Sequence, residues 1–167
     1  MKLLIANRGE IAVRIIRAAA ELDIASVAVF SEDDALSLHT LRANEAVPLT
    51  GSGPSAYLDI DQIIAAARSK ECDAIHPGYG FLSENAGLAQ RCSEEGIIFV
   101  GPTAETLELL GDKAQARALA ERCGVPLLDG SSTAVSLQQA KTFFADMGGN
   151  SSIMIKAVSG GGGRGMR

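Results

Sequence analysis

The chain has 167 residues, of which 47% are hydrophobic and 21% are charged. This length and composition fit one globular domain, or one domain with part of another, and they exclude a disordered or fibrous protein. The net charge is −5, and the aromatic residues are two Tyr and five Phe, with no Trp. Because nucleic-acid-binding proteins need a basic surface and stacking rings, we expect no nucleic-acid partner.

The sequence carries no sign of export or membrane insertion. No apolar run reaches the roughly 18 residues of a membrane helix, and Arg8 and Glu10 end the first apolar run after four residues. We therefore expect a cytoplasmic protein with no membrane partner. Cys72, Cys92 and Cys123 form no C-x-x-C pair, so they predict neither a disulfide framework nor a zinc site. We interpret them as reduced core residues.

The first part of the chain predicts strands that alternate with helices. Strands are predicted at residues 3–6, 26–30, 46–49, 74–76 and 97–100, and helices at residues 10–22, 36–43, 60–70 and 84–95. The helical spacing of the first helix predicts a buried face made of Ile11, Ile15, Ala18 and Leu22. Ser83 is the predicted N-cap of the last helix. This alternation predicts an α/β fold with a Rossmann-like parallel sheet and right-handed crossovers.

The pattern changes after residue 101. Helices are predicted at residues 104–110, 113–122 and 137–147, followed by a strand at 153–158 and a glycine-rich loop. We place a domain boundary near Gly111, which gives domains over 1–110 and 111–167. The second piece is short for a stable domain, and its last strand needs a pairing partner. We therefore expect the chain to be the truncated start of a longer protein.

Two lysines and the glycine-rich loop are candidates for phosphate binding. Residues 160–165 match G-x-G-x-x-G formally, but that fingerprint belongs in the first βα turn. Their backbone N–H groups can still close over phosphate oxygens; a flexible linker is the alternative. Lys156 interrupts the last strand, so we expect a buried stem with an ammonium suited to phosphate, or a snorkelling edge lysine. Asp112 is a predicted N-cap, and Lys113 beside it opposes the helix dipole unless an anion joins it.

Two segments follow strands, where open α/β sheets place their ligand sites. The denser is residues 76–85, in which glycines and a proline fix a tight path that exposes Tyr79; a rigid turn with a satisfied His76 is the alternative. Residues 7–10 follow the first strand and have the same two interpretations. Arg17 and Glu21 lie on the polar side of the first helix, which by default is a solvated face.

Together these segments resemble the N-terminal part of the biotin carboxylase family, whose fold is ATP-grasp. The matching stretches are residues 5–12 (IANRGEIA), 74–86 (AIHPGYGFLSENA), 99–102 (FVGP), 111–113 (GDK), 124–126 (GVP), 155–157 (IKA) and 160–167 (GGGGRGMR). They occur in order along the whole chain. Residues 127–130 lack the proline-glycine of many members, and Ser151-Ser152 stands where a Tyr-Pro pair is usual, which affects only the local path of the lid.

The resemblance implies an ATP-dependent ligase with a pre-ATP-grasp domain followed by the start of an ATP-grasp domain. Such enzymes use MgATP and bicarbonate to form carboxyphosphate and then carboxylate biotin on a carrier protein. By position, Lys113, Lys156, Gly162 and Gly163 match ATP-contacting residues. Tyr79 and Gly80 match residues near the biotin pocket, and Arg17 and Glu21 match a helix face used for dimer contact.

The resemblance also implies what this chain lacks. The magnesium-binding carboxylates, the bicarbonate-binding arginine and the general base of the family would lie beyond Arg167. We therefore expect no catalytic or metal-binding residue in this chain, and no turnover by the chain alone. A biotin carboxyl carrier and a carboxyltransferase are the implied partners, with a homodimer in the full-length protein.

Two other functions stay open at this point. One is a nicotinamide-dependent oxidoreductase with a Rossmann site, although an early G-x-G-x-x-G is missing. The other is a non-catalytic interaction fragment that keeps the dimer face. Within the family, the final acceptor (acetyl-CoA, propionyl-CoA, methylcrotonyl-CoA, pyruvate or urea) is selected by a separate domain.

Overall fold

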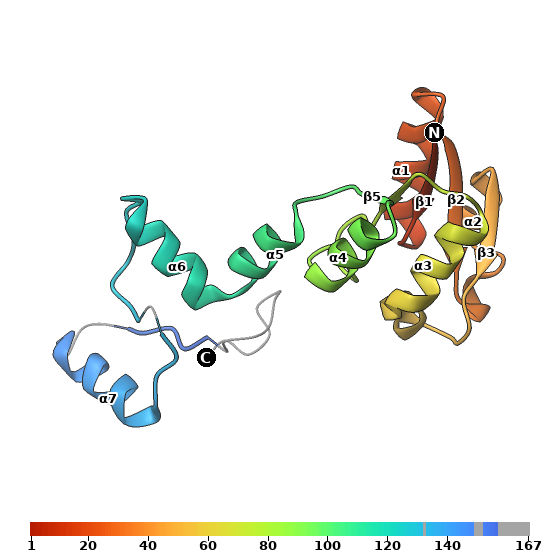
Figure 1. Cartoon of the computed structure of the whole chain (residues 1–167). Coiled ribbons are helices and arrows are strands. Elements are labelled where there is room, and N and C mark those ends of the chain that lie inside the picture. The colour runs from red at the N-terminus through yellow and green to blue at the C-terminus, as the bar shows by residue number, and fades with distance from the viewer. Residues whose placement is uncertain (132, 149–151, 157–167) are drawn as a thin grey trace. The chain divides into compact units, whose positions relative to one another are not determined.

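The structure, a computed structural model, describes residues 1–131, 133–148 and 152–156 (Figure 1). It divides into two compact units, Met1–Leu107 and Glu108–Arg167. The division lies close to the boundary predicted between residues 110 and 111, and α5 (Ala104–Gly111) runs across it. That the second unit is the start of an ATP-grasp domain stays a prediction.

The first unit is built on a five-stranded parallel sheet with the order β3-β2-β1-β4-β5. The strands are β1 (Lys2–Ile5), β2 (Ala25–Phe30), β3 (Glu45–Pro48), β4 (Ala74–His76) and β5 (Ile98–Phe99). Each overlaps its predicted range, so the predicted α/β fold with a parallel sheet is confirmed. Because all five strands run the same way, their carboxyl ends meet at one edge of the sheet, which becomes the place to look for a site.

Helices cover both faces of this sheet. They are α1 (Gly9–Glu21), α2 (Leu38–Arg42), α3 (Ile60–Ser69) and α4 (Ala86–Glu94), with 3₁₀ turns at Glu32–Asp34 and Pro54–Leu58. Alternate residues of β1 serve different faces, as the pleat requires. Leu3 and Ile5 pack in one cluster with the buried side of α1, whereas Leu4 packs in a second, larger cluster with residues of α3 and α4. The central strand is therefore buried on both sides.

The prediction of which side of α1 is buried was wrong, because a different side of the helix faces the sheet. The buried residues are Ala12, Val13, Ile16 and Ala19. Leu22 is 70% exposed, Ala18 is exposed, and Ile11 and Ile15 are only partly buried. The two alanines let the helix approach the sheet closely, because a methyl group fills less space than the larger side chains that the prediction placed there.

The predicted N-cap of α4 was also wrong. Asn85, not Ser83, accepts the capping hydrogen bond, from the backbone N–H of Leu88 at 3.0 Å. The backbone N–H of Ser83 donates to the carbonyl of Gly80 at 2.9 Å, and that of Asn85 donates to Leu82 at 3.1 Å. The turn that precedes the helix therefore continues past Ser83, which delays the start of α4.

The second unit contains α6 (Lys113–Arg122) and α7 (Leu137–Asp146) in addition to the end of α5. Asp112 caps α6 as predicted, accepting hydrogen bonds from the N–H groups of Ala114 at 2.8 Å and Gln115 at 3.0 Å. The predicted strand at 153–158 is not formed over residues 153–155, and only Lys156 takes part in a bridge. Among the described residues of this unit no strand is available to pair with it. Residues 157–158 lie outside the described residues.

Two further expectations on single residues needed correction. Lys156 is exposed, whereas we expected its stem to be buried, and the described residues directly before it form no strand. Cys72 and Cys92 are buried free thiols as expected, but the free thiol Cys123 is exposed just after α6. No helix in the described part of the chain is long and apolar enough to cross a membrane.

An ion cluster beside the sheet predicts how the stability of the first unit depends on pH. The Glu45 carboxylate lies 2.7 Å from Lys2 Nζ and 2.9 Å from Lys70 Nζ. Hydrogen bonds from these two ammonium groups lower the pKa of Glu45 from 4.5 to about 2. Because the folded pKa lies below the unfolded value, the stabilisation is complete above pH 4.5 and is lost as the pH falls toward 2.

We therefore expect Glu45→Gln to flatten the loss of stability over that acidic range, as measured by urea unfolding at a series of pH values. Added salt should reduce the difference between the two proteins, since the cluster is partly exposed. Glu84→Gln, at an exposed position before α4, is the control. An acid profile of Glu45→Gln that coincides with that of the unchanged chain would contradict the prediction.

Candidate functional site at the carboxyl edge of the sheet

The turn after β4 is attached to the residue that follows β1. Asn7 is fully buried, and its Nδ2 donates to the carbonyl oxygens of Pro77 at 2.7 Å and Tyr79 at 3.0 Å. Its Oδ1 accepts a hydrogen bond from the backbone N–H of Arg8 at 2.8 Å. Since β1 and β4 are neighbours in the sheet, their carboxyl ends bring these segments together. The segments predicted separately at residues 7–10 and 76–85 are therefore joined through Asn7.

The backbone of this turn takes an unusual path. Gly78 and Gly80 have positive φ angles of 68° and 69°, and Phe81 follows with φ 42°. Glycine adopts this region without cost, but a bulky residue such as phenylalanine does not. His76 Nδ1 accepts a hydrogen bond from the N–H of Gly78 at 3.0 Å, and burial lowers the pKa of His76, so its ring is neutral near pH 7. His76 therefore shapes the turn, in agreement with the alternative of a satisfied histidine.

Tyr79 is presented to solvent at the tip of the turn. Its side chain is 60% exposed, and its hydroxyl lies 3.4 Å from a carboxylate oxygen of Glu10 on α1. Gly80 is exposed beside it. The predicted exposure of Tyr79 is confirmed. An exposed aromatic ring on a rigid turn at this edge of the sheet is suited to contact a planar ligand.

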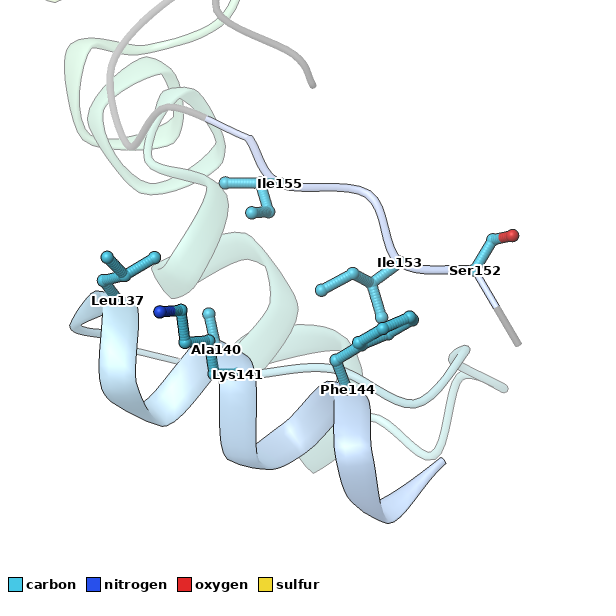
Figure 2. Close-up of a pocket in the computed structure, with 7 residues that line it drawn as sticks. All are labelled: Leu137, Ala140, Lys141, Phe144, Ser152, Ile153 and Ile155. Carbon is cyan, nitrogen blue, oxygen red and sulfur yellow. The ribbon is translucent and has the colours of Figure 1, made fainter. Parts of the chain in front are cut away.

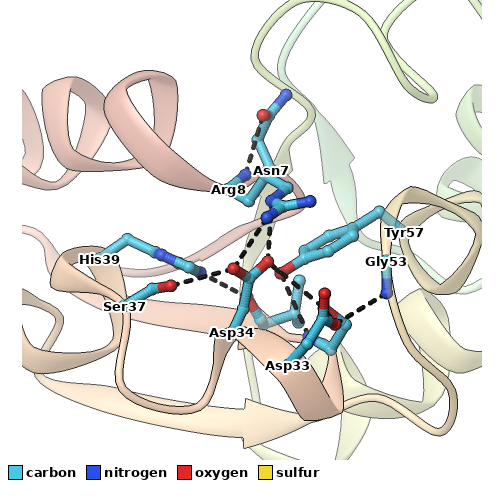
Figure 3. A network of polar contacts seen from close by, with 10 residues as sticks. Asn7, Arg8, Asp33, Asp34, Ser37, His39, Gly53 and Tyr57 are labelled. Carbon is cyan, nitrogen blue, oxygen red and sulfur yellow. Dashed lines mark hydrogen bonds and ion pairs between the residues drawn. The ribbon is translucent and has the colours of Figure 1, made fainter.

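A buried polar network supports the same edge from the β2 side (Figure 3). Asp34 is 6% exposed, and Arg8 contacts both of its carboxylate oxygens, at 2.8 and 2.9 Å. The Tyr57 hydroxyl donates to Asp34 at 2.8 Å, and the guanidinium of Arg8 lies 5.7 Å from the centre of the Tyr57 ring. The hydroxyl of Ser37 donates to the same carboxylate at 2.9 Å. Asp34 therefore joins three elements around one buried charge.

The network fixes the charge states of its members. Burial alone would raise the pKa of Asp34, but the hydrogen bonds from Tyr57 and Ser37 and the charge of Arg8 outweigh it and lower that pKa. Burial raises the pKa of Tyr57 and lowers that of His39. His39 lies fully buried with its Nε2 3.2 Å from the carbonyl oxygen of Val29, so the neutral ring donates from Nε2. Around neutral pH the site holds one paired carboxylate and a neutral imidazole.

This arrangement counts against a dinucleotide site. In a Rossmann enzyme an acidic residue after the second strand binds the cofactor ribose. Here the buried carboxylate after β2, Asp34, is already paired with Arg8, Tyr57 and Ser37. Its neighbour Asp33 accepts a hydrogen bond from the N–H of Gly53 at 2.7 Å, which closes a loop of the protein over the same place. The oxidoreductase alternative is therefore not favoured.

The predicted dimer-face residues lie together on α1. Arg17 and Glu21 are both exposed. They line a hollow on the helix surface with Glu10, Val13, Arg14 and Ala18. Glu10 also contacts Tyr79, so this helix surface adjoins the Tyr79 turn. Of the residues that line this hollow, Glu10 is the one that contacts the Tyr79 turn, while Arg17 and Glu21 lie further along α1.

The predicted nucleotide residues belong to the second unit. Lys113 is the first residue of α6 and is exposed, and Lys156 is exposed at the end of the described segment 152–156. Gly162 and Gly163 lie outside the described residues. A groove in this unit is lined by Leu137, Ala140, Lys141, Phe144, Ser152, Ile153 and Ile155 (Figure 2). It is mainly apolar, and neither Lys113 nor Lys156 lines it.

The donor groups of the second unit fit a phosphate better than a metal. Two exposed ammonium groups, those of Lys113 and Lys156, suit a phosphate chain. In contrast, the described residues contain no group of three or more His, Cys, Asp or Glu side chains that could hold a metal ion.

The sequence interpretation missed the Asp34 network. Its members are Arg8, Ser31, Asp34, Ser37, His39 and Tyr57. One signal was present: three consecutive acidic residues, Glu32, Asp33 and Asp34, directly follow the second strand. An acidic run at the carboxyl end of a strand is a candidate for a polar network at the ligand edge.

Comparison with known proteins decides the family. The family model described as "Biotin carboxylase, N-terminal domain" matches residues 1–107. The chain belongs to the biotin carboxylase family. Its resemblance, first noted from the motifs around residues 5–12 and 74–86, is confirmed.

Curated relatives extend this likeness over nearly the whole chain. The pyruvate carboxylase of Bacillus subtilis is 52% identical over 169 residues, which cover 99% of this chain and 14% of that protein. The biotin carboxylase of Nostoc is 51% identical over 169 residues, covering 99% of this chain and 37% of that protein. The chain therefore spans between about a seventh and about two fifths of the length of these family members.

Solved structures of family members share the fold. The biotin carboxylase of Campylobacter jejuni, described as a β,γ-ATP complex, is 41% identical with a TM-score of 0.94, over 99% of this chain and 37% of that one. The biotin carboxylase domain dimer of Hydrogenobacter thermophilus 2-oxoglutarate carboxylase is 42% identical with a TM-score of 0.91, over 99% of this chain and 36% of that one. It is described in complex with MgADP, ADP and bicarbonate.

Proposed function

We propose that this chain forms the N-terminal part of a biotin carboxylase, which uses MgATP and bicarbonate to carboxylate biotin on a carrier protein. The observation that carries the proposal is the likeness to family members at about 50% identity over 99% of the chain. When bound, ATP would supply the phosphoryl group that activates bicarbonate. Catalysis of this kind depends on positioning and on neutralising charge.

Each predicted residue has a defined part in this proposal. Lys113 and Lys156 bind nucleotide phosphates, and Gly162 and Gly163 close over them. In the first unit, Tyr79 and Gly80 contact biotin, for which an exposed ring on a rigid turn is suited.

The proposal also extends to partners and location. Arg17 and Glu21 take part in a homodimer, which the Hydrogenobacter domain dimer supports by analogy. A biotin carboxyl carrier, as a separate subunit or domain, presents the biotin that is carboxylated. A carboxyltransferase, also a separate subunit or domain, then takes the carboxyl group from it. We place the enzyme in the cytoplasm. The magnesium ligands and the general base come from residues other than those described here.

A hybrid enzyme tests the proposal directly. Residues 1–167 of this chain replace the matching residues of the Nostoc biotin carboxylase, which is 51% identical to it. We expect the hybrid to hydrolyse ATP in a reaction that depends on both bicarbonate and free biotin, and to carboxylate the biotin. The Nostoc enzyme itself is the positive control. A folded hybrid that binds neither nucleotide nor biotin would contradict the proposal.

A further inference from the structure

One buried side chain, that of Asn7, holds the turn that carries Tyr79. We propose that Asn7 is a positioning residue, which fixes the backbone of residues 77–80 so that Tyr79 and Gly80 face the ligand. The inference rests on the proposed function, in which these two residues contact biotin. It adds a group that touches no substrate and acts only through the turn.

The Asn7 side chain is held in one orientation. Its Nδ2 lies 2.7 Å from the Pro77 oxygen and 3.0 Å from the Tyr79 oxygen, so both N–H groups donate to the turn. Its Oδ1 accepts from the N–H of Arg8 at 2.8 Å. An asparagine amide offers two donors and one carbonyl, and all of these groups are engaged. The Asn7 side chain is fully buried, so water competes little for its amide group, and its bond to Pro77 lies in the interior.

Close packing around Gly78 means that only glycine fits at this point of the turn. A Cβ atom at Gly78 would lie 2.7 Å from Asn7 Nδ2 and 2.7 Å from Ile11 Cγ2. Any side chain at position 78 would therefore force the side chains of Asn7 and Ile11 to move. Gly78 also has φ +68°, a conformation that other residues rarely adopt. The glycine and the asparagine together let the turn lie directly on the end of β1.

A second set of contacts holds the far end of the turn, at Phe81. These contacts begin at Arg8, the residue that follows Asn7. Phe81 has φ 42°, a strained conformation that surrounding contacts must maintain. Its ring stacks on the Tyr57 ring, with centres 5.3 Å apart and planes 25° apart. Tyr57 donates to Asp34, which is paired with Arg8. Residues 77–81 are therefore fixed at both ends by the two residues that follow β1, Asn7 directly and Arg8 through the buried network.

A spectroscopic experiment on the whole chain tests the positioning. Asn7→Asp keeps the shape of the side chain but removes both donors, so we expect the backbone amide signals of Tyr79 and Gly80 to shift or broaden in ¹⁵N NMR spectra. Asn44→Asp is the control, because it makes the same change in an asparagine that uses its Oδ1 to accept two hydrogen bonds, both from Ser26, at the opposite edge of the sheet. Signals of Tyr79 and Gly80 that stay unchanged in Asn7→Asp would overturn the inference. Where Asn7→Asp fails to fold, Asn7→Ser gives the same comparison.

Kinetics of the hybrid enzyme separate this inference from the proposed function. We expect Asn7→Asp to raise the KM for biotin about 10-fold while the KM for ATP stays within about 2-fold, since a general loss of structure would affect both. Tyr79→Ala is measured beside it. If Tyr79→Ala leaves the KM for biotin unchanged, the proposed biotin contact fails. If Tyr79→Ala raises it and Asn7→Asp does not, the positioning role of Asn7 fails.

Discussion

Replacing Lys113 by alanine in the hybrid enzyme is expected to raise the dissociation constant of MgATP about 10- to 150-fold, and Lys156→Ala is expected to do the same. A hydrogen bond to a charged group contributes about 1.5–3 kcal/mol, which gives this range. Lys113 and Lys156 are both exposed residues of the second unit. Lys113 also begins α6, directly after the Asp112 carboxylate that caps this helix.

Lys141→Ala is the control for this prediction. Lys141 is an exposed lysine of the same unit, but it lies on α7 and lines the apolar groove. We expect the dissociation constant of MgATP to stay unchanged in Lys141→Ala, and the thermal unfolding of all three variants to stay close to that of the parent, because exposed lysines contribute little to stability. Unchanged ATP affinity in both Lys113→Ala and Lys156→Ala, measured by calorimetry, would remove the nucleotide assignment and leave the family membership intact.

The fold was predictable because its signals are local. Short apolar runs gave each strand of the sheet, two of them closed by Pro-Gly or Gly-Pro, and helical periodicity gave the helices between them. The buried face of α1 was not predictable in this way. Periodicity favours the largest side chains, Ile15 and Leu22 among them, whereas close contact with the sheet selected Ala12 and Ala19. The predicted strand did not form over residues 153–155 for a related reason: an apolar run becomes a strand only where a partner strand is present.

The candidate site, like the fold, was predictable only in part. The turn over residues 77–80 was predictable, because its glycines and proline and its position after a strand are visible in the sequence. The role of Asn7 and the Asp34 network were not. Asn7 lies 70 residues from Pro77, and Tyr57 lies 23 residues from Asp34. Only the pairing of β1 with β4 and β2 brings these residues together, and no periodicity records that pairing.

The second large effect concerns the stability of the first unit. We expect Asp34→Ala to lower the free energy of unfolding of the chain by about 2–3 kcal/mol, because breaking a buried ion pair leaves its partners without their acceptor. Tyr57 and Ser37 would keep buried or half-buried hydroxyl groups without this bond, and Arg8 would lose its paired charge. The Arg8 side chain is 33% exposed and can be partly hydrated, which holds the expected loss at the lower end of the range for buried pairs.

Urea unfolding at pH 7 of Asp34→Ala beside Asp61→Ala measures this effect. Asp61 also pairs with an arginine, Arg91, at 2.8 Å, but its side chain is 81% exposed, so its removal should produce only a small fraction of the change. The two variants should also differ in local structure. Once Tyr57 loses its bond to Asp34, the ring on which Phe81 stacks is less firmly held. We therefore expect faster hydrogen exchange of amides in residues 81–85 in Asp34→Ala but not in Asp61→Ala. Equal stability losses in the two variants would show that Asp34 acts as an ordinary surface charge and that the network does not support the turn.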